Sequence, residues 1–148
     1  MLTIETSDRL DAPAEEWLRL SVRIVVTGRR IANTQAVLQQ VLALFWPTAE
    51  LHDFYTTPYP KLAEATMLRI AFDLPAGYEG GVSRILETIG GSGWCVDIYE
   101  DGEQSAFWKP EDGALRPLSN HFHSAEVKLV PSSHLAESRK SFAPRLLQ

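Results

Sequence analysis

The most constraining feature of the sequence is a ten-residue segment, residues 18–27, in which an apolar residue recurs at every second position. Leu20, Val22 and Ile24 fall on one side of an extended chain, and the intervening positions are mostly polar. Because successive side chains of a strand point to opposite faces of a sheet, this pattern predicts a strand with one buried and one partly wet face. Such a strand is typical of an antiparallel sheet covered on one side.

The rest of the chain alternates between helix and strand signals. Apolar residues at helical spacing follow a capping residue, Asn33, and this helix should end before Pro47. A second helix is expected over residues 78–89, stopped by Gly90 and Gly91. Further strands are expected over residues 51–55, 66–74, 94–100, 105–109 and 121–130.

This order of elements predicts an α+β fold. We expect a mostly antiparallel sheet of five or six strands, with two helices on one face. The order is compatible with a ferredoxin-like core that carries a C-terminal hairpin extension. The 148 residues show no linker or internal repeat, so 1–148 is expected to form a single domain. Residues 132–148 form either a docked helix or a mobile tail.

Charge and composition narrow the function classes. The chain has 19 acidic and 14 basic residues, a net charge of −5, which disfavours nucleic-acid binding and suits a cationic partner better. Its one cysteine, Cys95, excludes an internal disulfide. No secretory signal is visible, and no apolar run approaches the roughly 20 residues that span a bilayer. We therefore expect a cytoplasmic protein without a membrane segment.

The hairpin expected over residues 94–109 has its turn at residues 101–102. A two-residue turn sets the register of the hairpin and places Glu100 opposite Glu103, a mildly unfavourable pair of like charges. Either the loop is longer than two residues, or the repulsion is tolerated at an exposed tip. The two-residue register also places Trp108 on the outward face of the hairpin.

The only closely spaced histidines are His121 and His123. Side chains two apart on a strand share a side, so these imidazoles could share a metal ion, with His52 and Asp53 as further ligands. Nothing in the spacing brings His52 close, and two surface histidines at the start of a strand account for the pattern more simply. The sequence shows no second His-x-Ser/Thr motif of the kind that a two-histidine phosphoesterase needs.

Other catalytic signals are weak. Cys95 is expected in mid-strand, without the helix N-terminus that would favour a reactive thiolate. The glycines at residues 90–93 follow a helix and precede a strand, which is the reverse of a phosphate-binding loop. We find no paired acid–base set, so the sequence favours a non-catalytic protein without a cofactor or metal.

The most unusual feature is the acidity of the hairpin region. From Asp97 to Asp112 there are six acids and a single base, Lys109. Aromatic residues rimmed by acids suit a surface that binds a basic protein. The alternative is a solvated hairpin whose aromatic residues pack inward. The partner-binding residues predicted from this pattern are Asp97, Tyr99, Glu100, Asp101, Glu103 and Trp108.

Three functions follow from these features. The first is a non-catalytic binding protein that engages a basic partner, for example a bacterial immunity or antitoxin protein that blocks a toxin. The second is a ferredoxin-like small-molecule-binding or enzymatic domain whose pocket contains His52, His121 and His123. The third is a homodimer formed through an open sheet edge or the wet face of the first strand.

Overall fold

The computed structural model describes residues 17–28 and 30–135 and contains one six-stranded sheet. Residues 132–135 form a further helical turn, and the rest of the predicted tail lies outside the described residues. The elements, in chain order, are β1 (Leu18–Thr27), α2 (Ile31–Phe45), β2 (Glu50–Pro58), β3 (Ala65–Leu74), α3 (Gly81–Ile89), β4 (Cys95–Ile98), β5 (Gln104–Trp108) and β6 (Phe122–Pro131).

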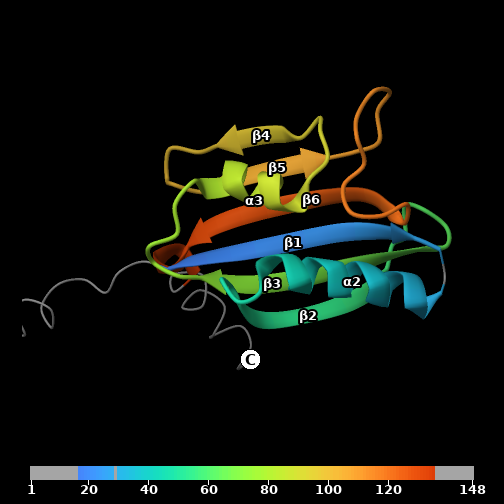
Figure 1. Ribbon diagram of the computed structural model, residues 1–148, viewed down its shortest axis with the longest axis horizontal. Coiled ribbons are helices and arrows are strands. Elements are labelled where there is room, and N and C mark those ends of the chain that lie inside the picture. The colour runs from blue at the N-terminus through green and yellow to red at the C-terminus, as the bar shows by residue number, and fades with distance from the viewer. Residues whose placement is uncertain (1–16, 29, 136–148) are drawn as a thin grey trace, which may run out of the picture.

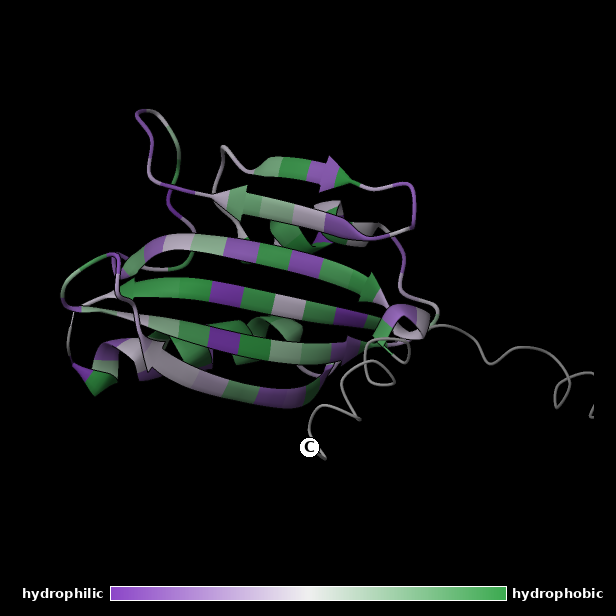
Figure 2. Cartoon of the chain, turned by 180° about the vertical axis from the view of Figure 1, so that it is seen from behind, coloured by the Kyte–Doolittle hydropathy of each residue, from purple (hydrophilic) through white to green (hydrophobic). Residues whose placement is uncertain are grey.

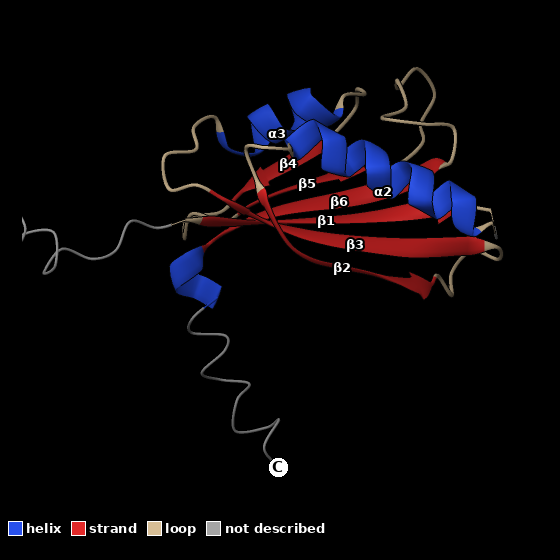
Figure 3. Cartoon of the chain, turned by 60° about the horizontal axis from the view of Figure 1, so that its bottom comes forward, coloured by secondary structure: helices blue, strands red, loops and turns tan. Residues whose placement is uncertain are grey.

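The strands lie in the order β2-β3-β1-β6-β5-β4, and every neighbouring pair is antiparallel (Figure 1). Both α2 and α3 cover the same face of this sheet (Figure 3). Neither α2 nor α3 covers the opposite face, which we call the helix-free face, and the helical turn of residues 132–135 lies at one end of it (Figure 2 and Figure 3). The predicted α+β fold, with an antiparallel sheet and two helices on one face, is confirmed.

The ferredoxin-like core stays a prediction. In the first half of the fold, β3 lies between β1 and β2, as expected for a split βαβ unit. In the second half, however, the strand that follows α3 is β4 at the far edge of the sheet. The place beside β1 is taken by β6, so the hairpin β4–β5 extends the sheet at an edge, and the last strand returns to the centre.

The core lies between the sheet and the two helices. The alternation in β1 is as predicted, with Leu20, Val22 and Ile24 almost fully buried under the helices. α2 packs on β1 and β3, where Phe45 meets Phe72 at a ring-centroid distance of 5.2 Å. α3 packs mainly on β5 and β6.

Of the two alternatives for the hairpin, the structure has the longer loop and not the two-residue turn. Cys95 pairs with Phe107, and the N–H of Tyr99 donates to the carbonyl of Glu103 at 2.9 Å, which leaves a loop of three residues. Gly102 takes the positive φ of +94° that such a loop requires. The longer loop shifts the register by one residue, and a shift of one residue exchanges the two faces of a strand.

Candidate functional site

The edge strand β4 and its partner β5 expose an unusual amount of apolar surface. Ile98 is 70% exposed and Tyr99 52%, while Val96 and Phe107 are each 42% exposed. Val96 and Ile98 lie on the helix side of β4, at the edge of the sheet beyond β5 and β6, the strands on which α3 mainly packs. We call this set, together with the exposed acids beside it, the hairpin surface: Val96, Asp97, Ile98, Tyr99, Glu100 and Phe107.

The two other predicted acids have structural roles in the hairpin loop. A carboxylate oxygen of Asp101 accepts the N–H of Glu103 at 3.0 Å. The Glu103 carboxylate lies 2.7 Å from Nδ1 of His134, in the helical turn that follows β6. Asp101 and Glu103 therefore brace the loop, and Asp97 and Glu100 are the acids of the hairpin that are free to face a partner.

Asp101, Glu103 and His134 are also the described residues that could hold a metal ion, because their ligand atoms lie within 4.8 Å of one another. The carboxylate–imidazole contact and the turn at Asp101 account for this cluster without an ion. The arrangement could accept a divalent cation, but nothing else in the hairpin points to one.

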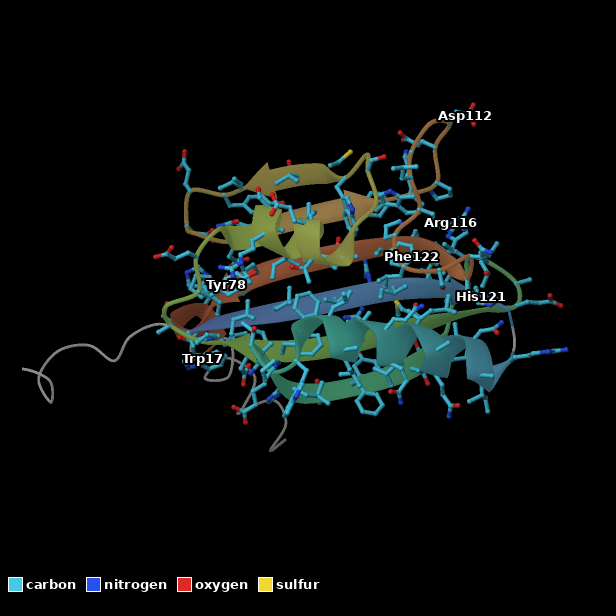
Figure 4. All side chains as sticks on the ribbon, in the orientation of Figure 1. Trp17, Tyr78, Asp112, Arg116, His121 and Phe122 are labelled. Atoms are coloured by element: carbon cyan, nitrogen blue, oxygen red, sulfur yellow. The ribbon has the colours of Figure 1, made fainter. Side chains whose placement is uncertain are left out.

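The acidic run from Asp97 to Asp112 does not form one surface. Glu111 and Asp112 belong to the loop between β5 and β6, at the end of β5 opposite the hairpin loop (Figure 4). Lys109 lies 3.7 Å from Glu111 and partly neutralises that end. These acids are close together in the sequence, but they lie at the two opposite ends of β5.

Trp108 is not on the outward face, so that prediction is wrong. Its side chain is 1% exposed and its Nε1–H donates to the carbonyl of Ser92 at 2.7 Å. Its ring meets that of Phe122 edge-on, with centroids 5.5 Å apart. Sequence reasoning missed Phe107 and Ile98 as exposed residues, because the face of Phe107 depends on the register of the hairpin and the exposure of Ile98 on the edge position of β4.

The structure does not bring the three predicted pocket histidines together. His52 lies in β2, next to a register irregularity at the level of Leu20 in β1. His121 precedes β6, and its carbonyl accepts the N–H of Thr27 at the other end of β1 (Figure 4). His52 is therefore level with Leu20 and His121 with Thr27. At about 3.3 Å per strand residue, these two positions along β1 are roughly 20 Å apart, which excludes a site shared by His52 and His121. The Nδ1 atom of His123 lies 3.2 Å from the hydroxyl of its neighbour Ser124.

A groove of about 990 Å³ lies between α2 and β2. Its wall includes Ile31 and Leu38 from the helix and Phe54 and Pro58 from the strand. It is mostly apolar, and none of the three pocket histidines lines it. The groove forms because α2 packs over β1 and β3 and leaves the helix-side face of β2 uncovered.

No protein-family model matches the chain, and neither the curated proteins nor the solved structures contain a match. Among the residues that the structure describes, no helix has the length and apolar character needed to cross a membrane. A functional inference therefore has to come from the surfaces described above.

Proposed function

We propose that this chain is a non-catalytic binding protein that engages a basic protein partner through the hairpin surface. The observation that supports this most is the group of exposed apolar side chains at an open sheet edge, with Asp97 and Glu100 beside them. In the concrete form expected from the sequence, it is a cytoplasmic bacterial immunity or antitoxin protein that acts by covering the working surface of a toxin.

The physical parts of such an interface are present. Ile98 lies on the helix side of β4 and Phe107 on the helix-free side of β5, so their exposed side chains offer apolar contact area on both sides of this edge, and a few such anchors can supply most of a binding energy. The acids beside them would steer a cationic partner and exclude acidic competitors. As an edge strand, β4 also has backbone N–H and C=O groups that no other strand of the sheet pairs. A partner could therefore add to the sheet while its basic residues meet the acids.

The charge component can be tested with two variants of equal net charge. Tagged wild-type protein first isolates its partner from the source cell, and the purified pair is then followed by surface plasmon resonance. Asp97→Lys/Glu100→Lys should slow association by about tenfold or more at low salt and flatten the salt dependence. Glu111→Lys/Asp112→Lys, at the other end of β5, makes the same change in charge and should leave most of the rate intact. Equal effects of the two variants would contradict the proposal.

The apolar component has its own test. Ile98→Ser and Phe107→Ala should each raise the Kd by roughly 30-fold through faster dissociation, as expected for an anchor worth about 2 kcal/mol. Both positions are exposed, so the variants should fold normally. Unchanged dissociation in both would remove the hairpin surface as the interface.

A second candidate function rests on the α2–β2 groove, whose volume and apolar wall suit a small apolar ligand. The dye ANS serves as a probe, and Ala36→Trp, at an exposed groove position on α2, should reduce its fluorescence enhancement severalfold. Full enhancement in that variant would exclude the groove as the binding site. The histidine pocket is not part of this candidate.

The homodimer also stays a prediction. β2 and β4 are both open edges, and β2 carries two features that blunt an edge, the irregularity at His52 and the terminal Pro58. Light scattering on the purified chain measures this directly, and a dimer would leave β4 as the edge to examine first.

A further inference from the structure

The helix-free face of the sheet contains a polar hollow of about 360 Å³ over its central strands. Ser21 in β1 and Ala71 in β3 lie directly opposite each other and line it. Their side chains are small, so the surface dips here between longer neighbours. Figure 2, seen from this side, shows hydrophilic residues alternating with hydrophobic ones along the central strands.

Three cationic side chains line this hollow, although the chain as a whole is acidic. Arg23 and Arg69 occupy directly opposite positions on β1 and β3, and Lys128 lies opposite Ser21 on β6. Like charges directly opposite each other on a sheet are unfavourable. The packing of the core does not require these two arginines, because both side chains lie on the helix-free face.

The carboxylates at the hollow do not balance these cations. Glu126 is shared, with one oxygen 3.2 Å from Arg23 and 3.7 Å from Lys128. Asp53 is the other acid in the wall, so three cations face two carboxylates. The Arg69 guanidinium lies over the Tyr55 ring at 5.9 Å and, within residues 17–28 and 30–135, has no carboxylate at ion-pair distance.

We propose that this hollow binds a small molecule through an oxyanion, either a carboxylate or a phosphate. Arg69 and Arg23 would supply guanidinium groups, which match the planar geometry of such anions, and the Ser21 hydroxyl would donate from the floor. The Tyr55 ring holds the Arg69 guanidinium at the rim. An anion there would also relieve the repulsion between the two arginines.

This site rests on other residues than the hairpin surface. The hollow is centred on β1 and β3, whereas the hairpin surface lies on β4 and β5. The two adjoin at β6, where Glu126 of the hollow lies directly opposite Phe107. Failure of either proposal leaves the other standing.

The test is a titration with inorganic phosphate and, separately, with acetate, at constant ionic strength set with chloride. Backbone and arginine Nε–H resonances of the full chain report binding by NMR. Saturable shifts centred on Ser21 and Arg69 are expected with at least one anion. A stronger response to phosphate identifies a phosphate ligand, and a stronger response to acetate identifies a carboxylate ligand.

Three variants make the assignment specific. Arg69→Gln removes the arginine that has no ion pair with any described residue, and Ser21→Leu fills the hollow while keeping every charge, so each should weaken binding at least tenfold. Arg84→Gln is the matched control, because Arg84 also lies over a tyrosine ring, that of Tyr78 at 5.2 Å, but on α3. It should bind like the wild type.

Two results would overturn the proposal. One is the absence of saturable shifts with both anions. The other is a response that Ser21→Leu leaves intact or that Arg84→Gln weakens as much as Arg69→Gln does, because the anion would then be sensing only the general surface charge.

Discussion

Replacing Trp108 by alanine should lower the free energy of unfolding by about 3–5 kcal/mol, the range for large aromatic side chains truncated in a core. The Trp108 side chain is 1% exposed, so nearly all of its apolar area is lost from the core. Within this total, the edge-on contact with Phe122 accounts for about 0.5–1.5 kcal/mol. The hydrogen bond from Nε1 to the Ser92 carbonyl accounts for about 1 kcal/mol.

The neighbouring aromatic residue should behave differently. Phe107 is 42% exposed on the helix-free face, so Phe107→Ala should cost less than about 1 kcal/mol, the size of a cross-strand contact. Urea unfolding followed by far-UV circular dichroism measures both values by linear extrapolation. Because a typical domain has only about 5–15 kcal/mol of stability, Trp108→Ala could fail to fold, and Trp108→Phe then provides a milder loss of about 1–2 kcal/mol.

The comparison of the two positions tests which face of β5 is buried. If Phe107→Ala destabilised the protein more than Trp108→Phe, Phe107 and not Trp108 would be the buried residue of β5. The hairpin surface would then contain Trp108 in place of Phe107. The stability measurement therefore checks the composition of the proposed interface before any partner is known.

Three further predictions concern stability. Gly91→Ala should be less stable than Gly113→Ala by about 1–3 kcal/mol in urea unfolding. Both glycines have a positive φ, but only at Gly91 would an added Cβ lie 2.6 Å from a proline ring and 2.8 Å from a carbonyl oxygen. Equal stabilities of the two variants would contradict this prediction. Asp73→Ala should cost about 1.5–3 kcal/mol, because it removes the carboxylate 2.6 Å from Arg19, whose side chain is only 12% exposed; wild-type stability in the same assay would show that the ion pair contributes nothing. Burial raises the pKa of the Tyr78 hydroxyl above its usual 10.0, so the folded state holds this proton more tightly than the unfolded state does. The stabilisation of the folded state by this proton is fully present below pH 10.0 and is lost as the pH rises past that value. Tyr78→Phe should therefore reduce the fall in melting temperature between roughly pH 9 and 11. If the melting temperature of Tyr78→Phe falls as steeply as that of the wild type, another group causes the loss.

Local patterns were sufficient to predict much of the fold. The alternation in β1 identified its buried face, and the helical spacing identified α2. The ends of the helices were less predictable. α2 begins at Ile31, before the expected cap Asn33, whose side-chain amide instead lies 3.5 Å from the carbonyl of Thr27. α3 begins at Gly81, three residues after the predicted start, because Gly80 takes a left-handed conformation.

The two candidate binding surfaces depend on information that a linear pattern does not contain. The hairpin surface depends on loop length, and residues 100–102 are compatible with a turn of either two or three residues. The hollow depends on strand order, because Arg23, Arg69 and Lys128 meet only when β3 and β6 both pair with β1. Their spacing along the chain gives no sign of this proximity.

The position of β6 also affects how the chain can fold. Leu20 in the first strand pairs with Leu129 in the last, so a central ladder of the sheet forms only after nearly all the described residues are available. Contacts between such distant positions have a high loop-closure cost and slow folding. Until β6 inserts, β1 and β5 both present unpaired edges, a state that is open to association with other chains. During synthesis on the ribosome, this chain should therefore remain incompletely folded until residues 122–131 have emerged.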